Sequence, residues 1–224
     1  MNKIINGGDI LNNYWAIFEK RKNNFFRFDT RVYLNLLGNP TDKDICIGAV
    51  VGKNPGSALP SLYNCPTLQE IELDGDQLLP NIRSIFLKAY KRSNKLMQKN
   101  SYIQVLNLLY ICNKDLSQAI KTIADYPNQI ICDTEEKHFP FLWYLWGNDN
   151  KNLNLYKNRF YDLVANIHFY LDTNTKVIIP NYPALNDSAR HTQVTTETVP
   201  VSVRCLSPYK DWKSVDDLCC SDLN

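Results

Sequence analysis

ICIGAVVGKNPGSA, at residues 45–58, is the clearest indicator of architecture in this chain. Its first seven residues are apolar and rich in β-branched side chains, which is typical of a strand that is buried on both faces. A polar, glycine-containing loop follows at once, over residues 52–58. In open parallel sheets, ligands bind outside the carboxyl ends of the strands. We therefore predict a central strand at 45–51 with a binding loop at its end.

Three further short apolar runs are also typical of buried strands, and they cover residues 102–106, 139–146 and 201–205. Apolar residues at helical spacing predict helices at 78–97, 116–123 and 155–171. Strands that alternate with helices favour a parallel sheet with right-handed crossovers. We therefore expect an α/β fold with three layers, α/β/α, around a central sheet of four mostly parallel strands.

The remaining segments are expected to add smaller elements to this core. They are a helix around 15–20, a hairpin-like stretch at 25–37, a short strand at 177–179 and a frayed tail at 213–224. A chain of 224 residues suits one domain. We expect a single domain over 1–224, with its core at about 25–212.

Charge and cysteine content limit the classes of protein. The 25 basic and 23 acidic residues leave a formal charge of +2, so any contact with nucleic acid must be local. The cysteines lack C-x-x-C pairs and zinc-finger spacing with the three histidines, which argues against a zinc site. We expect neither a metal nor a cofactor. Several cysteines lie in or beside apolar runs, which favours reduced thiols in a reducing compartment. No signal pattern or apolar stretch of roughly 18–20 residues occurs, which predicts a cytoplasmic protein without membrane contact. We expect a monomer.

The loop after the first strand presents an asparagine on a restricted backbone. Pro55 fixes its own φ and restricts Asn54 to extended geometry, while Gly52 and Gly56 allow angles that other residues resist. This arrangement exposes the Asn54 amide and nearby backbone N–H groups to a ligand. An Asn-Pro-Gly sequence is also a common structural turn, which is the alternative interpretation.

The segments that follow the other strands complete a recognisable set. Asn107-Leu108-Leu109 follows the second strand, Trp146-Gly147 ends the third, and Leu206-Ser207-Pro208 follows the fourth. Together with the Gly-Lys-Asn-Pro-Gly loop, this set resembles the uracil-DNA glycosylase superfamily, closest to its mismatch-specific and thymine-DNA branch. It also resembles an uncharacterised bacterial domain family with Asn-Pro-Ser, Asn-Leu-Phe and Trp-Gly motifs. The resemblance covers about residues 30–160 and a patch near 200–210.

This resemblance implies a uracil-DNA-glycosylase-like fold and a set of roles. Asn54 matches the residue that positions the attacking water, and Asn107 matches one that reads the edge of a base. Gly52, Pro55 and Gly56 would frame the base, and Tyr63 is the candidate for an aromatic wall, unless it is an ordinary exposed loop tyrosine. The 206–208 loop matches one that contacts the DNA backbone. The family histidine is missing there, which argues against strong leaving-group stabilisation.

A local basic segment supports contact with nucleic acid. No acidic residue occurs between Gln77 and Lys114. Basic residues on the predicted helix share one stripe opposite its apolar face and are candidates to track phosphates; a solvated helix face is the equal alternative. The predicted DNA-binding residues are Ser57, Lys88, Lys91, Arg92, Lys95, Ser207, Tyr209 and Lys210.

The functional prediction is a monofunctional DNA glycosylase. It would hydrolyse the N-glycosidic bond of a damaged, mismatched or modified base, after flipping the base out of the stack. The loops that would read the substrate differ from those of the standard enzymes of this superfamily. This difference favours an atypical base, such as a modified cytosine of phage DNA, and a role in antiviral defence. Two alternatives stay open: a non-catalytic nucleotide or nucleic-acid binding module of the same fold, and a nucleoside hydrolase.

Overall fold

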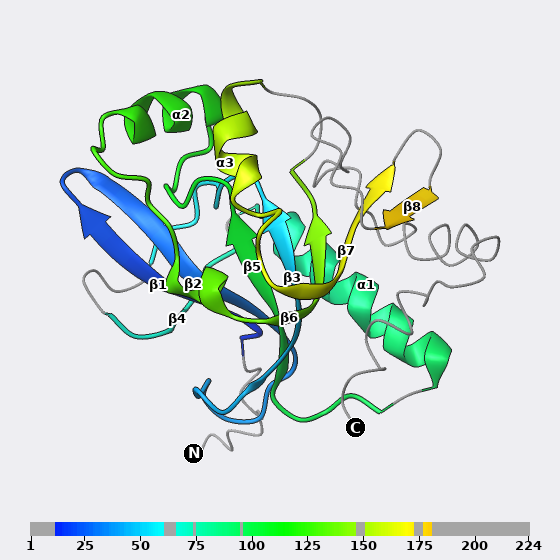
Figure 1. The fold of residues 1–224 in the computed structure, drawn as a ribbon. Coiled ribbons are helices and arrows are strands. Elements are labelled where there is room, and N and C mark those ends of the chain that lie inside the picture. Colours follow the sequence, from blue (N-terminus) through cyan, green and yellow to red (C-terminus); the bar gives the residue numbers. More distant parts are fainter. Residues whose placement is uncertain are drawn as a thin grey trace, which may run out of the picture.

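A single eight-stranded sheet forms the centre of the computed structural model, which describes residues 12–60, 66–73, 75–94, 96–146, 151–172 and 177–180. The strand order is β4-β1-β2-β5-β3-β6-β7-β8 (Figure 1). The strands are β1 (Tyr14–Arg21), β2 (Asn24–Asn35), β3 (Ile45–Gly52), β4 (Gln69–Glu70), β5 (Ser101–Asn107), β6 (Phe139–Tyr144), β7 (Ala165–Asp172) and β8 (Val177–Pro180). The helices are α1 (Leu78–Ser93), α2 (Leu116–Ala124) and α3 (Asn154–Asn158), with 3-10 turns η1 (Asp133–Glu136) and η2 (Lys151–Leu153). The predicted α/β class is confirmed, but the sheet has eight strands rather than four.

The middle of the sheet is parallel and its ends are antiparallel. Strands β5, β3, β6 and β7 run parallel to one another, whereas β1, β2 and β4 at one end and β8 at the other pair antiparallel. The strands predicted at 45–51, 102–106 and 139–146 are confirmed as β3, β5 and β6. The strand predicted at 201–205 and the tail at 213–224 lie outside the described residues. Strand β7 occupies the fourth parallel position.

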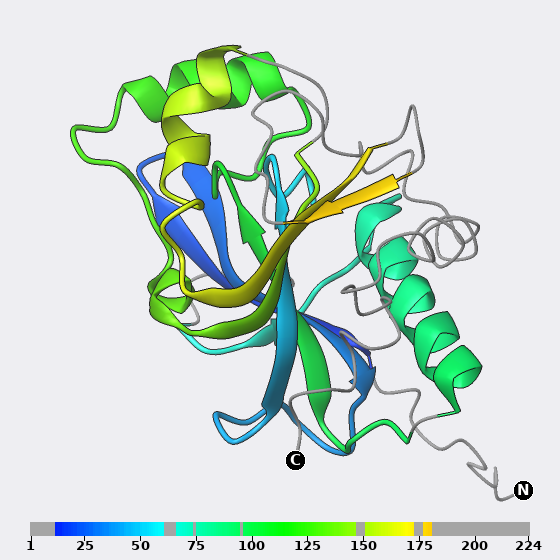
Figure 2. The ribbon, with the colours of Figure 1, turned by 45° about the vertical axis from the view of Figure 1, so that its right-hand side comes forward.

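Both faces of the central strands are buried, as their apolar sequences predict. On β3, Val50 packs in the core under α1, while Ala49 and Val51 pack in the core on the opposite face. Helix α1 contributes Ile82 and Phe86 to the first core, and α2 and α3 lie over the second (Figures 1 and 2). The helices predicted at 78–97 and 116–123 are thus present, although α1 ends four residues early, where Asn94 adopts a left-handed conformation.

The helix predicted around 15–20 is wrong, because this segment is strand β1. It forms a hairpin with β2 through a two-residue turn in which Lys22 has a φ of 53°. A positive φ is typical of the turns that match the twist of paired strands. Aromatic and β-branched residues at 14–18 suit a strand, and pairing with β2 buries them. The hairpin expected at 25–37 therefore begins at Tyr14.

The helix predicted at 155–171 is also wrong. Helix α3 covers its first few residues, and β7 begins at Ala165. Aromatic and β-branched side chains dominate 167–171, and five residue pairs join β7 to β6 in parallel register. Tertiary pairing therefore overrides the helical spacing. The short strand predicted at 177–179 is confirmed as β8, which pairs with β7.

A bulge in β2 sets the orientation of its side chains. Phe26 and Phe28 pack in the core on the α2 side, whereas Val32 and Leu34 pack in the core on the α1 side. The register with β1 shifts between these pairs, where Asp29 has a φ of 41°. One extra residue in a strand turns the following side chains to the other face. Arg27, between the two phenylalanines, consequently faces the α1 side.

None of the described α-helices has both the length and the apolarity needed to cross a lipid bilayer. Cys46, Cys112 and Cys132, the cysteines in the described part of the chain, carry free thiols.

Candidate functional site

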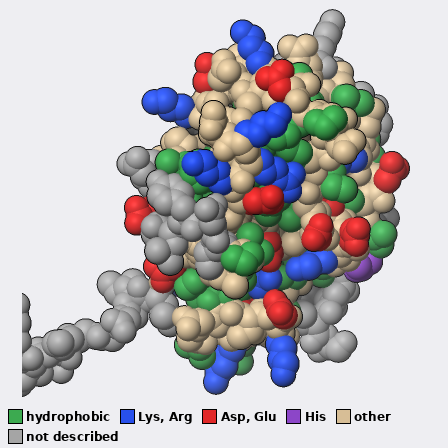
Figure 3. All heavy atoms as spheres, turned by 90° about the vertical axis from the view of Figure 1, so that its left-hand side faces the viewer, with side chains coloured by type: hydrophobic (Ala, Val, Ile, Leu, Met, Phe, Trp, Pro, Cys, Tyr) green, Lys and Arg blue, Asp and Glu red, His purple; other side chains and the backbone are tan. Residues whose placement is uncertain are grey.

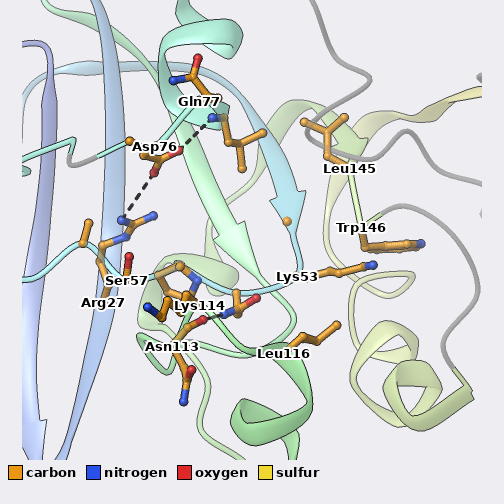
Figure 4. Close-up of a pocket in the computed structure, with 17 residues that line it drawn as sticks. Arg27, Lys53, Ser57, Asp76, Gln77, Asn113, Lys114, Leu116, Leu145 and Trp146 are labelled. Atoms are coloured by element: carbon orange, nitrogen blue, oxygen red, sulfur yellow. Dashed lines mark hydrogen bonds and ion pairs between the residues drawn. The ribbon is translucent and has the colours of Figure 1, made fainter.

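A pocket of about 580 Å³ lies at the carboxyl ends of β3 and β6. Its walls come from the loop after β3, the segment after β6, and the amino ends of α1 and α2 (Figure 4). Small-molecule pockets typically measure about 300–1,000 Å³. The lining residues are Arg27, Gly52, Lys53, Asn54, Pro55, Gly56, Ser57, Ala58, Gly75, Asp76, Gln77, Leu78, Asn113, Lys114, Leu116, Leu145 and Trp146. The predicted loop thus lines a pocket of suitable size.

The loop is held by its backbone, and both of its glycines occupy positions that disfavour a side chain. The carbonyl oxygens of Gly52 and Lys53 accept hydrogen bonds from the next segment of the chain, from Leu108 N at 2.9 Å and Leu109 N at 2.8 Å. A Cβ at Gly52 would lie 3.1 Å from Asn107 Oδ1, which is tighter than ordinary packing. Gly56 has a φ of +74°, which side chains resist. The chain therefore fixes the loop against the end of β5.

Asn54 lines the pocket with one half of its amide engaged. Its Nδ2 donates a short hydrogen bond to the backbone carbonyl of Asn113, which precedes α2. Its Oδ1 has no hydrogen-bond partner among the described residues. The Nδ2 bond fixes the amide plane, so Oδ1 is the atom that can accept a hydrogen bond from a ligand or a water molecule.

Asn107 lies next to this loop but does not line the pocket. It pairs with Gly52 across β3 and β5, and only 1% of it is exposed. Its Nδ2 finds no hydrogen-bond partner within the described ranges. Asn107 thus shapes the pocket through its contact with Gly52. Because its side chain is buried, it cannot make the predicted contact with a base in this conformation.

Arg27 is a lining residue that the sequence reasoning missed. It is 2% exposed, and its Nε and Nη1 have no hydrogen-bond partner in the part of the chain that is described. Its closest acidic group is Asp76, whose Oδ2 lies 4.0 Å from Nη1 (Figure 4). Burial lowers the pKa of Arg27, yet a guanidinium stays charged in proteins. The sequence feature that could have revealed Arg27 is its position as a lone charge in the otherwise apolar run Phe25-Phe26-Arg27-Phe28.

Asp76 was missed as well, and it is the one carboxylate among the described lining residues. Its Oδ1 accepts hydrogen bonds from Leu78 N at 2.8 Å and Leu79 N at 3.4 Å, at the start of α1. An aspartate just before an apolar helical pattern is a typical helix-start signal, which could have located it. One carboxylate oxygen therefore caps α1 while the other faces Arg27.

Trp146 and Leu145 form an apolar wall across the pocket from Arg27 (Figure 4). The Trp146 ring packs on Tyr144, with centroids 4.4 Å apart, and its Nε1 has no hydrogen-bond partner in the described ranges. Tyr63, predicted as the aromatic wall, lies outside the described residues. The aromatic ring that lines the described pocket is thus that of Trp146.

A buried network supports the strand end beside the loop. Arg159, just after α3, donates from Nε to Glu135 Oε2 at 2.9 Å, and from Nη2 to the carbonyls of Asn107 and Leu108 at 2.9 and 3.0 Å. The Tyr110 hydroxyl donates to the same carboxylate, and burial raises the pKa of Tyr110. These bonds hold the end of β5, to which the 52–56 loop is attached.

The predicted phosphate contacts are only partly described. Ser57 is exposed at the pocket, and Lys88 and Lys91 are exposed on α1. At 1.5 Å per residue, Lys88 lies about 15 Å along α1 from the end that reaches the pocket. Lys88 and Lys91, the described members of the stripe on α1, are therefore remote from the pocket. Lys95, Ser207, Tyr209, Lys210 and the side chain of Arg92 lie outside the description.

Charge on the face formed by β1, β2 and α2 is mixed. Basic and acidic side chains are interspersed there (Figure 3). At the pocket the balance is different, because the described lining residues include three basic residues, Arg27, Lys53 and Lys114, and one acidic residue, Asp76. No group of three or more His, Cys, Asp or Glu residues able to hold a metal ion occurs within the described ranges.

No family model, curated protein or solved structure matches the chain. The likeness to uracil-DNA glycosylases accordingly rests on the residues quoted for it.

Proposed function

We propose that this protein is a monofunctional DNA glycosylase that hydrolyses the N-glycosidic bond of a damaged, mismatched or modified base. The observation that carries the proposal is Asn54, which lines the pocket with Nδ2 bonded to Asn113 and Oδ1 available. An amide oxygen held in this way orients a water molecule toward the sugar carbon of a bound nucleotide. DNA is the proposed partner, and neither a metal nor a cofactor enters the proposal.

The chemistry suits a site without a strong general base. Glycosidic hydrolysis passes through an oxocarbenium-like state, into which water must be placed as the base departs. Asparagine orients water but takes up no proton, so catalysis relies on positioning and electrostatics. The nearest carboxylate candidate, Asp76, is engaged with α1 and Arg27. We therefore expect slow turnover on bases that are already good leaving groups.

The pocket walls support a flipped nucleotide as the ligand. Extrusion of a base costs a few kcal/mol, which stacking in an apolar, aromatic pocket offsets. Leu145, Trp146 and Leu116 supply apolar surface, and the polar loop 52–57 faces them. An atypical base, such as a modified cytosine of phage DNA, and a role in antiviral defence extend this proposal.

The test compares Asn54→Ala with the unmodified protein on DNA that carries modified cytosines, with alkali-labile abasic sites as the readout. We expect base release from the unmodified protein and a loss of about 100-fold in the variant, because the water molecule is no longer positioned. Asn128→Ala, at an exposed position, is the matched control and should release base normally. An Asn54→Ala protein that cuts as well as the original would remove the proposed role.

A second candidate is a non-catalytic nucleotide or nucleic-acid binding module. The observation that favours it is the absence of histidine and of any carboxylate besides Asp76 among the described lining residues. This candidate predicts binding of DNA or nucleotide with no base release on any substrate. A nucleoside hydrolase, in contrast, would cleave free nucleosides.

A further inference from the structure

We infer that Arg27 forms a phosphate-binding subsite inside this pocket and takes the phosphate of the nucleotide whose base the pocket holds. The inference deepens the proposed function and rests on it for the class of substrate. It assigns a role to a buried side chain that the Asn54 chemistry does not use and whose Nε and Nη1 have no hydrogen-bond partner among the described residues.

The first argument is the unmet hydrogen-bonding capacity of Arg27. A buried guanidinium is costly unless its donors are satisfied and its charge is paired. Nε and Nη1 have no hydrogen-bond partner in the described chain, and the ion pair to Asp76 spans 4.0 Å, beyond hydrogen-bonding distance. The planar guanidinium matches phosphate oxygens in a bidentate manner.

The second argument is the local charge. Lys53 and Lys114 line the same pocket as Arg27, and Asp76 is the one acidic side chain in the described lining. The Cys112 thiol interacts with Arg27, but burial raises the pKa of Cys112 to about 11, so it is neutral and supplies no counter-charge. Even without Lys53, the two cations Arg27 and Lys114 exceed the single described carboxylate, and this balance favours an anionic group.

The third argument is the arrangement of the walls. Arg27 and Asp76 lie on one side of the pocket and Trp146 on the other (Figure 4). A nucleotide lying across the pocket would place its phosphate at Arg27 and its base along the apolar wall. The loop that carries Asn54 lies between these two ends in the lining, where the sugar would be.

The test is a calorimetric comparison of thymidine 5′-monophosphate with thymidine as probes of the full chain. We expect the monophosphate to bind the unmodified protein about tenfold more tightly, because it gains charged hydrogen bonds. Arg27→Met should lose this preference and keep its affinity for thymidine. Lys121→Gln, which removes an exposed charge at the end of α2, is the matched control and should keep the preference.

A thymidine dinucleotide separates the two sources of phosphate. If the monophosphate binds more tightly than the dinucleotide, the subsite takes the phosphate of a free nucleotide. If the dinucleotide binds equally well or better, the subsite takes a phosphodiester of DNA. If neither binds the unmodified protein more tightly than thymidine, the subsite does not exist, whatever the folding of the variant. Arg27→Lys, which keeps the charge and loses the planar fork, should retain part of the preference.

These outcomes differ from those of the glycosylase test. Asn54→Ala should keep the phosphate preference while losing base release. If the protein prefers the phosphate-bearing ligand but releases no base from any DNA, the proposed glycosylase activity is ruled out and the phosphate subsite is supported. If the protein releases base but shows no preference for the phosphate-bearing ligand, the subsite is ruled out and the glycosylase activity is supported.

Discussion

Arg27 and Arg31 lie on the same strand and are both buried, yet their surroundings differ. Arg31 donates to both carboxylate oxygens of Asp29, at 3.1 and 2.7 Å, and to the carbonyl of Thr41 at 2.9 Å. Among the described residues, Arg27 has one ion pair, which spans 4.0 Å to Asp76. Arg31 is therefore paired within the fold, whereas Arg27 keeps donors that have no hydrogen-bond partner among the described residues.

This contrast predicts opposite effects on stability. Arg31→Met should lower the free energy of unfolding by about 3–5 kcal/mol, because Asp29 is left buried without its partner. Arg27→Met should leave stability unchanged or raise it, since an incompletely paired charge is removed. Urea denaturation of both variants measures the two changes. Equal losses would show that Arg27 is as fully paired as Arg31.

The sequence predicted the site only where local chemistry determines it. The loop with Asn54 was predictable because Pro55 restricts the backbone, and the two glycines permit a tight loop, in any context. Local signals could have located Arg27 and Asp76 one by one, but not their proximity, because they meet only when the fold brings β2 and the start of α1 together. The burial of Asn107 was equally inaccessible, because it depends on its pairing with Gly52.

At the scale of elements, the start of α2 connects helix stability to the pocket. Asp115 caps this helix, and its carboxylate accepts hydrogen bonds from Ser117 N at 2.8 Å and Gln118 N at 3.3 Å. Asn113 and Lys114, immediately before the cap, line the pocket. The cap therefore fixes the segment whose carbonyl holds Asn54.

We expect Asp115→Ala to lower the free energy of unfolding by about 1 kcal/mol, because two backbone N–H groups lose their acceptor. Chemical denaturation checks this value. Ser117→Ala changes an exposed residue in the same turn and should have little effect. A similar loss in both variants would mean that the helix start as a whole, rather than the cap, is sensitive.

Elements with continuous apolar sequence or a clear start signal were predictable, namely β3, β5, β6, α1 and α2. The segments of β1 and β7 were predicted as helices because apolar residues at 14–18 and 163–171 fit either period. What makes them strands is a partner distant in sequence: Tyr14 pairs with Val32, and Ile167 pairs with Phe141. Local spacing contains no information about such partners.

At the scale of the whole molecule, a histidine joins two parallel strands of the sheet. His168 Nδ1 on β7 is 2.6 Å from the Tyr144 hydroxyl on β6. Burial lowers the pKa of His168 below its ordinary value of 6.5. The folded protein therefore binds this proton less readily than the unfolded chain does.

The sign of the pH effect follows from this difference. The contribution of His168 is fully present above about pH 6.5, and it declines as the pH falls from there toward the lower folded pKa. We expect the free energy of unfolding to fall between about pH 7 and pH 5, and His168→Gln to flatten that dependence. His138→Gln, at an exposed site, is the control for a general histidine effect. A variant with an unchanged slope would exclude His168 as the source.

The strand order has a consequence for how the chain reaches this structure. Strand β3 is flanked by β5 and β6, which both come later in the sequence, and β2 also pairs with β5, from Thr30 to Val105. Contacts between distant segments require long loops to close before they contribute, which slows folding. During synthesis on the ribosome, the β1–β2 hairpin can assemble early. The apolar strand that leads into the Asn54 loop gains both of its neighbours only after about a hundred more residues have emerged, and until then it is exposed to misassociation.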